Sequence, residues 1–357
     1  MALEAVRVPA VEPETKPGIR LAAVRGADLA PEVKAAVLTD VLPWVQRFAG
    51  RIVVVKHGGS TLGPTPGLKG GRAAGGDPAG NGLVGGHPAA AGPLPPDPLG
   101  GDAVLRDVAM LRALGVRPVV VHGGGKAITA WLERLDLPAR FVDGLRVTDA
   151  ATLAVVEMVL AGQVNKALVT GLNQAAGRPL AVGLSGCDGG LLTARPKRPG
   201  GRDLGFVGEI VAVNTGFLEQ LLEAGFVPVI APLAVGEGGQ RYNVNADDAA
   251  AAVAGALGAE KLVFLTDVPG VMADLDGDGQ AETLSTLDAA TAQALIARGE
   301  IRGGMVPKVQ AGLRALAAGA GSVHIIDGRR PHALLVELFT SEGVGTMVVA
   351  GGEGHGA

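Results

Sequence analysis

The chain has 357 residues, of which 48% are hydrophobic and 18% charged, and its net charge at pH 7 is −4. This length supports a sizeable core, as one large α/β unit or as two lobes. The absence of a basic excess argues against partnership with nucleic acid or a membrane surface, and the 3% aromatic content argues against a base-stacking platform. The single cysteine, Cys187, excludes an intrachain disulfide framework and a cysteine-rich metal site, and it fits a reducing cytoplasm.

The N-terminus shows no basic segment followed by an apolar core, so no secretory signal is expected. The longest apolar candidate for a membrane span, residues 249–258, is alanine-rich and shorter than the roughly 20 residues that a span needs. We therefore expect a buried helix there and no membrane segment.

The N-terminal region is expected to hold a loose tail and one helix. Residues 1–28 are rich in proline, glutamate and small residues, which favours disorder. Residues 31–48 predict an amphipathic helix, which Pro43 should kink or break. Its apolar stripe needs a partner, either the protein's own core or another subunit. The stripe consists of Val33, Val37, Val41, Trp44 and Phe48.

The remaining chain alternates short apolar strands with helices. Residues 62–101 interrupt this pattern with a low-complexity run of glycine, proline and alanine, which predicts a disordered insertion. Order resumes at Asp102, a predicted N-cap. The alternation predicts a three-layer αβα sandwich with a largely parallel central sheet. Strands are expected at residues 52–56, 118–121, 180–184, 227–231, 262–266 and 323–326, and helices at 153–172, 247–257 and 310–318.

Two of the expected strands end in glycine-rich turns, KHGG at residues 56–59 and HGGG at residues 122–125. Glycine lets backbone amides approach an oxyanion closely, and a following helix N-terminus adds positive potential. Either run alone also suits an ordinary turn. Together they would lie at the carboxyl edge of one sheet, where α/β proteins bind ligands. With Lys56 and Lys308, which follows GGMVP, they favour phosphoryl transfer, although Walker A, dinucleotide and protein-kinase motifs are absent.

Polar residues suited to a substrate stand near residues 243–247 and at Arg146. The alternation of Asn243, Asn245 and Asp247 would place all three on one side of an extended segment. Helix capping would explain one of them but not three in phase. Arg146 could bind a carboxylate through two parallel hydrogen bonds, although an isolated arginine is more often an ordinary surface charge.

Taken in order, these motifs resemble those of the N-acetylglutamate kinase family, within the amino acid kinase superfamily. The resemblance covers roughly residues 30–350 apart from the insertion. Each stretch is weak alone, but the ordered set is specific. The stretches are KHGG (56–59), VVVHGGG (119–125), GLRVT (144–148), VEMVLAGQVNK (156–166), AVGLSG (181–186), NVNAD (243–247), LTDVPG (265–270), GMVPK (304–308) and IDGR (326–329).

The resemblance implies transfer of the γ-phosphoryl group of ATP to the side-chain carboxylate of N-acetyl-L-glutamate, the second step of arginine biosynthesis. Lys56 and Lys308 would stabilise charge on the transferring group, and Asp247 would hold both lysines. Magnesium would be held mainly by the ATP phosphates, with no dedicated protein metal site. The acceptor carboxylate is already ionised near neutral pH, so no general base is needed.

The resemblance also assigns binding residues. Arg146 would bind the α-carboxylate of acetylglutamate. The implied substrate-binding residues are Gly124, Gly125, Arg146 and Asn243. The implied ATP-binding residues are Gly58, Gly59, Asp267, Gly270, Val271 and Met272.

Within the family, the chain resembles the arginine-inhibited form, through the helix at residues 31–48 and the segment at 337–347. This implies feedback inhibition by L-arginine, with Glu337 and Gly343 in the effector site, and a homohexamer built as a trimer of dimers. The implied organisation is a tail and a helix for oligomerisation and arginine binding, an acetylglutamate lobe that carries the insertion, and an ATP lobe. These regions span residues 1–50, 51–236 and 237–350.

Two other functions stay open. A sibling kinase for acetylaminoadipate in lysine biosynthesis would differ by one methylene, which is worth only about 1–3 kcal/mol of discrimination, and the GLRVT stretch disfavours it. A non-catalytic arginine-sensing module of the same fold is disfavoured by the presence of Lys56, Asp247 and Lys308. The chain departs from the family pattern at His57 and Ser60, where relatives often have an aromatic residue and a small-Ala-Met stretch.

Overall fold

The computed structural model describes residues 30–58, 102–274 and 280–351. Residues up to Pro43 and residues from Trp44 onward form two separate compact units. The described part of the first unit is helical, because α1 (Pro31–Phe48) continues through Pro43. Of the kink or break expected at this proline, the break is therefore wrong. The expected tail (1–28) and insertion (62–101) lie outside the described residues.

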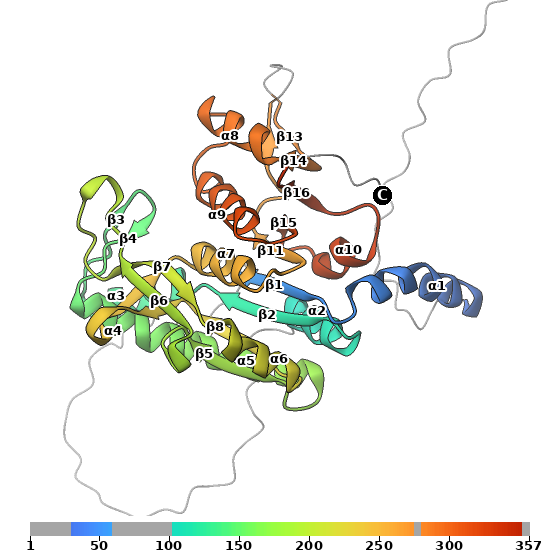
Figure 1. Cartoon of the computed structure of the whole chain (residues 1–357), viewed down its shortest axis with the longest axis horizontal. Helices are drawn as coiled ribbons and strands as arrows, with labels where there is room; N and C mark the ends of the chain where they lie inside the picture. Colours follow the sequence, from blue (N-terminus) through green and yellow to red (C-terminus); the bar gives the residue numbers. More distant parts are fainter. Residues whose placement is uncertain (1–29, 59–101, 275–279, 352–357) are drawn as a thin grey trace, which may run out of the picture. The chain divides into compact units, whose positions relative to one another are not determined.

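The second unit is built on one eight-stranded sheet, in the order β14-β16-β15-β11-β1-β2-β8-β5 (Figure 1). Neighbouring strands pair in parallel, except for β15 and β16, which are antiparallel. The sheet confirms the α/β prediction and all of the strands expected from the sequence. The strands are β1 (Ile52–His57), β2 (Arg117–His122), β5 (Ala181–Ser185), β8 (Val227–Ala231), β11 (Lys261–Thr266), β14 (Thr286–Asp288), β15 (Ser322–Asp327) and β16 (Gly345–Val349).

Helices cover both faces of this sheet. Val54 of β1 packs in one apolar cluster with Ala250 of the helix α7, whereas Val53 and Val55 are fully buried on the opposite face. Successive strand residues alternate between faces, so a strand buried on both faces is a nearly continuous apolar run. The helices are α2 (Ala103–Ala113), α3 (Gly125–Arg134), α4 (Ala150–Glu157), α5 (Asn165–Ala176), α6 (Thr215–Glu223), α7 (Ala246–Ala256), α8 (Ala289–Ala297), α9 (Met305–Ala317) and α10 (Ala333–Phe339).

A π-helical segment, Met158–Val164, joins α4 to α5 in one continuous helical run. Within the described residues, this run (Ala150–Ala176) is long and apolar enough to cross a membrane, and 50% of its most apolar window is buried inside the fold. Inside the run, Asn165 is fully buried and donates hydrogen bonds to the carbonyls of Leu184 and Val229. The run therefore has the character of a core helix. The run contains the charged residues Glu157 and Lys166, so it is not the long, charge-free apolar stretch that a membrane span needs.

Three small sheets, none of them predicted from the sequence, complete the second unit. A four-stranded closed sheet, β10-β7-β6-β9, and two hairpins flank the main sheet. In Figure 1 the hairpin β3–β4 lies beside β6 and β7, and a bridge between Thr148 and Gly205 joins the two regions. These pieces matter because they carry Arg146 and Asn243. The strands are β3 (Phe141–Val142), β4 (Leu145–Arg146), β6 (Leu192–Pro196), β7 (Val207–Val213), β9 (Leu233–Val235), β10 (Arg241–Val244), β12 (Met272–Ala273) and β13 (Glu282–Thr283).

Candidate active site

Two lysines share one carboxylate at the centre of the second unit. Lys56 Nζ lies 2.7 Å from Asp247 Oδ1, and Lys308 Nζ lies 2.8 Å from Asp247 Oδ2. The side chains of Lys56 and Asp247 are each 9% exposed, and that of Lys308 is 23% exposed. A single anion therefore fixes two cations at a set separation, and Lys308 is the more accessible of the two.

The cluster perturbs its own ionisation. Burial lowers the pKa of Lys56, the charge of Asp247 partly opposes this, and the charge of Lys308 lowers the pKa further. Burial alone would raise the pKa of Asp247, but the two lysines outweigh burial and hold that pKa below its ordinary value. Asp247 therefore stays ionised at neutral pH, and its charge is what keeps a buried ammonium at Lys56 favourable.

Three elements bring these side chains together. Lys56 stands near the carboxyl end of β1, and Lys308 stands in the first turn of α9, which begins earlier than the sequence predicted. Asp247 lies in the first turn of α7, where Asn245 is the N-cap and accepts hydrogen bonds from the amides of Asp247 and Asp248. The prediction of one extended segment through Asp247 is therefore wrong. The strand β10 ends at Val244, and capping by Asn245 starts the helix there.

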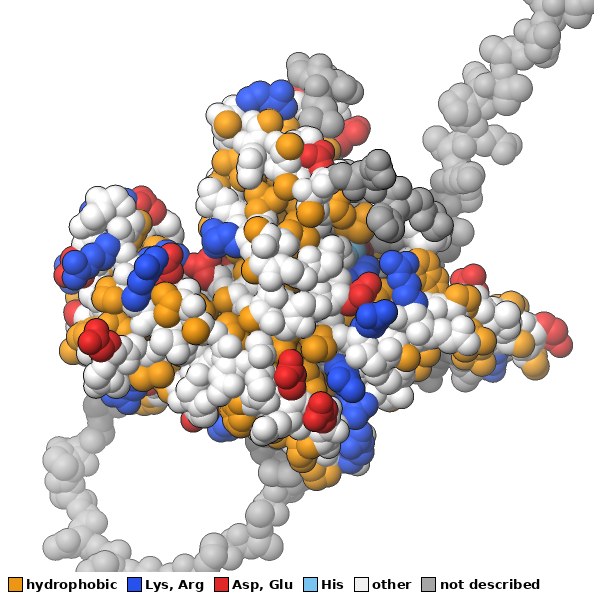
Figure 2. Space-filling model, in the orientation of Figure 1, with side chains coloured by type: hydrophobic (Ala, Val, Ile, Leu, Met, Phe, Trp, Pro, Cys, Tyr) orange, Lys and Arg blue, Asp and Glu red, His pale blue; other side chains and the backbone are white. Residues whose placement is uncertain are grey.

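A pocket of about 230 Å³ opens beside Lys56. The four residues implied for acetylglutamate all line it, although they come from separate elements of the chain. Figure 2 shows the surface hollowed between the part that carries β3, β4, β6 and β7 and the part that carries α8 and α9. The lining consists of Lys56, Gly123, Gly124, Gly125, Ile128, Phe141, Gly144, Leu145, Arg146, Leu160, Val207, Pro232, Asn243, Val244, Asn245 and Ala246.

Arg146 supplies a buried cationic group at this pocket. It is only 8% exposed, and its Nη2 donates to the Gly125 carbonyl (3.1 Å) and to Thr129 Oγ1 (2.8 Å). Its Nη1 is buried and has no hydrogen-bond partner among the described residues. Burial lowers the pKa of Arg146, yet a guanidinium stays charged in proteins. A buried cation with an unused donor is suited to an incoming carboxylate.

Gly124 packs closely against the π-helical segment at the pocket. A Cβ atom at this position would lie 2.5 Å from Cδ2 of Leu160, so a side chain there would force Leu160 to move. Leu160 belongs to the π-helical segment, a geometry that is rare and frequent at functional sites. The close approach leaves the backbone of the HGGG turn as the surface that a ligand meets.

The residues implied for ATP lie on the other side of Lys56. Gly58 follows β1 and Asp267 follows β11, and these strands are parallel neighbours, so both residues lie at the same edge of the sheet. Asp267 is exposed and Met272 is 41% exposed, so both are accessible to a ligand. Gly59 lies outside the described residues.

Gly270 and Val271, both implied for ATP binding, stabilise the turn after β11. A Cβ atom at Gly270 would lie 2.6 Å from Thr346 Oγ1, and the amide of Val271 donates to that oxygen at 2.8 Å. The side chain of Val271 is fully buried in the core. These residues fix the turn after β11, and any contact of Val271 with nucleotide would be made by its backbone.

Comparison with known proteins identifies the family. Residues 51–327 match the model of the amino acid kinase family. Acetylglutamate kinase from Gloeobacter violaceus is 45% identical over 326 residues, which are 91% of this chain and 95% of that protein. The chain belongs to the acetylglutamate kinase family. It is therefore an enzyme of the kinase class, as the sequence motifs predicted.

Solved structures similar to this acetylglutamate kinase family member include two of one synthase and one of a carbamate kinase. N-acetylglutamate synthase from Neisseria gonorrhoeae, complexed with coenzyme A and N-acetyl-glutamate, has a TM-score of 0.70 and 26% identity, covering 89% of this chain and 64% of that chain. The same synthase with coenzyme A and L-arginine has a TM-score of 0.66, again at 26% identity, covering 89% of this chain and 65% of that one. Carbamate kinase from Giardia lamblia bound to AMP-PNP, with a TM-score of 0.56, 15% identity and coverage of 85% and 99%, shares the fold.

In this acetylglutamate kinase family member, the implied effector residues Glu337 and Gly343 lie together. The carboxylate of Glu337 accepts one hydrogen bond from His324 Nδ1 and another, of 2.7 Å, from the amide of Val344. Gly343 has a φ of 57°, and a Cβ atom there would lie 3.4 Å from Glu337 Oε2. Burial would raise the pKa of Glu337, but the hydrogen bond and charge of His324 outweigh it and lower that pKa.

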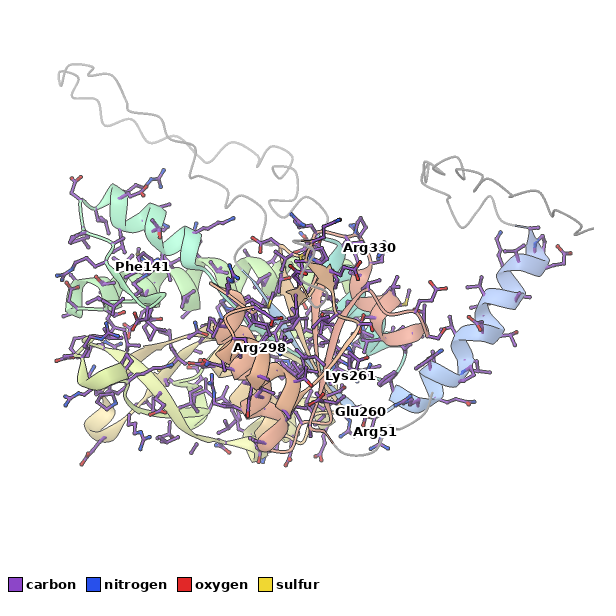
Figure 3. The ribbon with its side chains drawn as sticks, turned by 90° about the horizontal axis from the view of Figure 1, so that it is seen from above. Arg51, Phe141, Glu260, Lys261, Arg298 and Arg330 are labelled. Atoms are coloured by element: carbon purple, nitrogen blue, oxygen red, sulfur yellow. The ribbon has the colours of Figure 1, made fainter. Side chains whose placement is uncertain are left out.

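Lys261 and Phe48 extend this cluster, and the sequence did not single out Lys261 or His324. Lys261 Nζ lies 5.4 Å from the ring centre of Phe48, whose ring packs edge-on against Phe339 at 6.2 Å. Burial lowers the pKa of Lys261, and the charge of Glu337 opposes this. In Figure 3 the labelled Lys261 lies near Glu260 and Arg51, away from Phe141 at the substrate pocket.

Phe141 was also missed in the sequence. Its ring centre lies 4.6 Å from the guanidinium carbon of Arg146, and it lines the pocket while 55% exposed. The available signal was the Asp143-Gly144 dipeptide, whose two positive φ values, 50° and 77°, make the tight turn between β3 and β4.

Proposed function

We propose that the protein transfers the γ-phosphoryl group of ATP to the side-chain carboxylate of N-acetyl-L-glutamate, within arginine biosynthesis. The observation that carries this proposal is the pocket that holds Arg146 and Lys56 together. Arg146 has an unused buried donor for one carboxylate, and Lys56 belongs to the ion-paired cluster where a second carboxylate meets phosphate. A small dicarboxylate matches this pair of cations.

The remaining lining suits the body of the substrate. Asn243 donates from Nδ2 to Thr148 Oγ1 at 3.2 Å, which orients its amide at the pocket. Such an oriented amide can hydrogen-bond the acetamido group of acetylglutamate. Ile128, Phe141 and Leu160 supply apolar contacts for the methylene groups and the acetyl methyl group.

The transfer itself needs alignment and charge neutralisation. An oxygen of the acceptor carboxylate attacks the γ-phosphorus, and the bond from that phosphorus to the bridging oxygen of ADP breaks. Lys56 and Lys308 would neutralise charge on the transferring group, while Asp247 sets their separation. Gly58 would donate its amide to the phosphates. Magnesium would arrive with ATP, because it prefers oxygen ligands and usually binds substrate phosphates.

We propose the same functional division as the resemblance implies, with acetylglutamate bound mainly within residues 51–236 and ATP mainly within residues 237–350, except that Asn243 contributes to the first site and Gly58 to the second. The two regions meet where β1 pairs with β11 in the continuous sheet. The protein would work in the cytoplasm, where its substrate ATP is found.

Acceptor-dependent release of ADP tests the proposal. With magnesium and ATP, the protein should release ADP rapidly with acetylglutamate, more slowly with acetylaminoadipate, and at background without an acceptor. Faster turnover with acetylaminoadipate would indicate the lysine-pathway activity instead. A folded protein without acceptor-dependent turnover would contradict the kinase proposal and favour an arginine-sensing module.

Replacing Arg146 by methionine is expected to raise the KM for acetylglutamate by about 10- to 150-fold, because a hydrogen bond to a charged group is worth roughly 1.5–3 kcal/mol. The KM for ATP should change little, since Arg146 lies on the acceptor side. Steady-state kinetics with each substrate varied would measure both values. The exposed Arg140→Met variant is the matched control, and equal effects in the two variants would contradict the assignment.

L-Arginine is proposed as an inhibitor that binds near Glu337 and Gly343, and the assembly is proposed to be a hexamer, built as a trimer of dimers. Support for the effector comes from the buried Glu337 carboxylate beside Gly343. The structural likeness to a synthase solved with L-arginine adds to it. Support for the assembly comes from α1, whose Val33, Val37 and Leu38 are 46%, 52% and 73% exposed.

A Glu337→Gln variant is expected to need at least about tenfold more arginine for half-inhibition, because losing a charge-assisted hydrogen bond is worth roughly 1.5–3 kcal/mol. Its activity without arginine should stay close to that of the wild type. Inhibition curves of both proteins, with the exposed Glu342→Gln variant as control, give the comparison. Unchanged inhibition in Glu337→Gln would remove this residue from the effector site.

A further inference from the structure

His57 stands between the proposed catalytic Lys56 and the proposed phosphate-binding Gly58, yet the proposed chemistry does not use its ring. The side chain is fully buried, and its Nε2 lies 2.8 Å from Oδ2 of Asp102. The Asp102 side chain is only 9% exposed. Burying either the imidazole or the carboxylate without the other would cost free energy, so the two groups depend on their mutual contact.

Asp102 connects this contact to a helix. Its other oxygen, Oδ1, accepts a hydrogen bond of 2.9 Å from the amide of Val104 and so caps α2. Burial would raise the pKa of Asp102, but the hydrogen bond and charge of His57 outweigh it and lower that pKa. One carboxylate thus joins the carboxyl end of β1 to the N-terminus of α2.

The backbone of His57 reaches the second glycine turn. Its carbonyl accepts a hydrogen bond of 2.9 Å from the amide of Gly123, and His57 is the register partner of His122 in the pairing of β1 with β2. A displacement of His57 would therefore move the start of both glycine turns, as well as Lys56 on its other side.

We propose that His57 and Asp102 form a positioning pair for phosphoryl transfer, which holds the carboxyl end of β1 so that Lys56 Nζ and the Gly58 amide meet the ATP phosphates. This inference rests on the proposed function. Neither side chain lines the substrate pocket, so the pair acts through its neighbours. Misplacing reactive groups by about 1 Å can cost roughly 100-fold in rate.

The pair should affect the two substrates differently. Acetylglutamate would be held by Arg146 of β4 and Asn243 of β10, whereas the ring of His57 contacts Asp102 at the start of α2. ATP would be held by the turn that begins at Gly58, next to His57. Loosening the pair should therefore lower kcat and raise the KM for ATP, while acetylglutamate binds as before.

The experiment compares His57→Phe, His57→Gln and Asp102→Asn in the full-length enzyme. His57→Phe keeps a ring but loses the hydrogen bond, and kcat/KM for ATP should fall by about 10- to 100-fold. His57→Gln can still donate an amide hydrogen to Asp102. The decrease in log(kcat/KM) for ATP should therefore be at most half of that in His57→Phe. Asp102→Asn keeps an acceptor for the cap but loses the charge, so it should also lower kcat/KM for ATP. Calorimetric binding of acetylglutamate should stay within about twofold in all of them.

The matched control uses another His–Asp pair on the same helix. His332 Nδ1 lies 2.6 Å from Asp107 Oδ1, which joins α2 to the segment before α10. His332→Phe would loosen α2 without touching the end of β1, and it should keep the KM for ATP of the wild type. If His57→Phe and His332→Phe lose kcat/KM for ATP equally, or if His57→Phe loses nothing, the positioning role is wrong.

Misfolding of a variant and failure of the proposed function can both be distinguished from failure of the positioning role. If His57→Phe does not fold, His57→Gln and Asp102→Asn decide, because wild-type values of kcat and of KM for ATP in folded Asp102→Asn would overturn the proposal. If the wild type itself shows no acetylglutamate-dependent release of ADP, the proposed function fails, and the pair has no transfer reaction to position.

Discussion

Lys56→Met is expected to lower kcat by about 100- to 1,000-fold, by analogy with the roughly 2.7–4 kcal/mol that one oxyanion donor supplies. Methionine keeps most of the apolar stem of lysine but removes the ammonium group that would neutralise the transferring phosphoryl. Asp247 keeps its ion pair with Lys308, so no carboxylate is left unpaired and the fold should remain stable. Steady-state kinetics with a thermal unfolding curve would measure both properties.

The control for this prediction is Lys166→Met. Lys166 is exposed and contacts Asn165 and the Gly183 carbonyl, away from the cluster. This variant should keep nearly normal kcat. A folded Lys56→Met enzyme with a kcat within a few fold of the wild type would show that Lys56 does not stabilise the transition state.

Asp247→Asn is expected to impair both catalysis and stability. Among the ion pairs of the described residues, Lys56 and Lys308 share Asp247 as their only carboxylate partner, and this change removes its charge. Breaking a buried pair by removing one partner typically costs about 3–5 kcal/mol, and we expect the free energy of unfolding to fall by up to that amount. Activity should also fall by at least about 100-fold, because the lysines lose their fixed separation.

The same variant should show opposite pH trends in stability and activity. Burial already lowers the pKa of Lys56, and losing Asp247 removes the charge that opposes this. Between the lowered folded pKa and the ordinary value, the unfolded state binds more protons, so stability rises with pH. Activity requires a charged Lys56, so the residual kcat should rise as pH falls. Chemical unfolding and kinetics at several pH values between 6 and 9 would show whether the trends oppose each other.

Asp248→Asn is the matched control, since Asp248 is adjacent in the chain and 21% exposed. It pairs with Lys197 and Arg314, and such partly exposed pairs contribute about 0–1 kcal/mol each. This variant should keep the pH profile of the wild type. Parallel pH trends in Asp247→Asn and Asp248→Asn would contradict a special role for Asp247.

The sequence predicted six of the eight strands of the main sheet, because these six are short apolar runs rich in β-branched residues, and it did not predict β14 or β16. It also pointed to Lys56, Lys308 and Asp247, through motifs whose order resembles one family. The start of α9 was placed too late because Pro307 looks like a breaker, although proline is tolerated in the first turn of a helix. The alternation of polar residues at 243, 245 and 247 suggested an extended segment as far as Asp247. The same residue types also cap helices, and Asn245 caps α7 here.

Other features depend on contacts that no local pattern contains. The His57–Asp102 bond joins residues that are 45 positions apart, on either side of a low-complexity stretch. The stacking of Phe141 on Arg146 depends on a hairpin of two-residue strands, too short to produce a periodic signal. The π-helical segment carries no compositional mark, because its residues would suit an α-helix equally well.

The most direct test of this account is the position of the phosphoryl group on the product. Hydroxylamine converts an acyl phosphate into a stable hydroxamate, and fragmentation by mass spectrometry shows which carboxyl carbon carries it. With Arg146 on the α-carboxylate and Lys56 at the reacting end, the account predicts the side-chain hydroxamate of acetylglutamate. Trapping at the α-carboxyl group, or no hydroxamate while acetylglutamate binds, would contradict the proposed arrangement of the site.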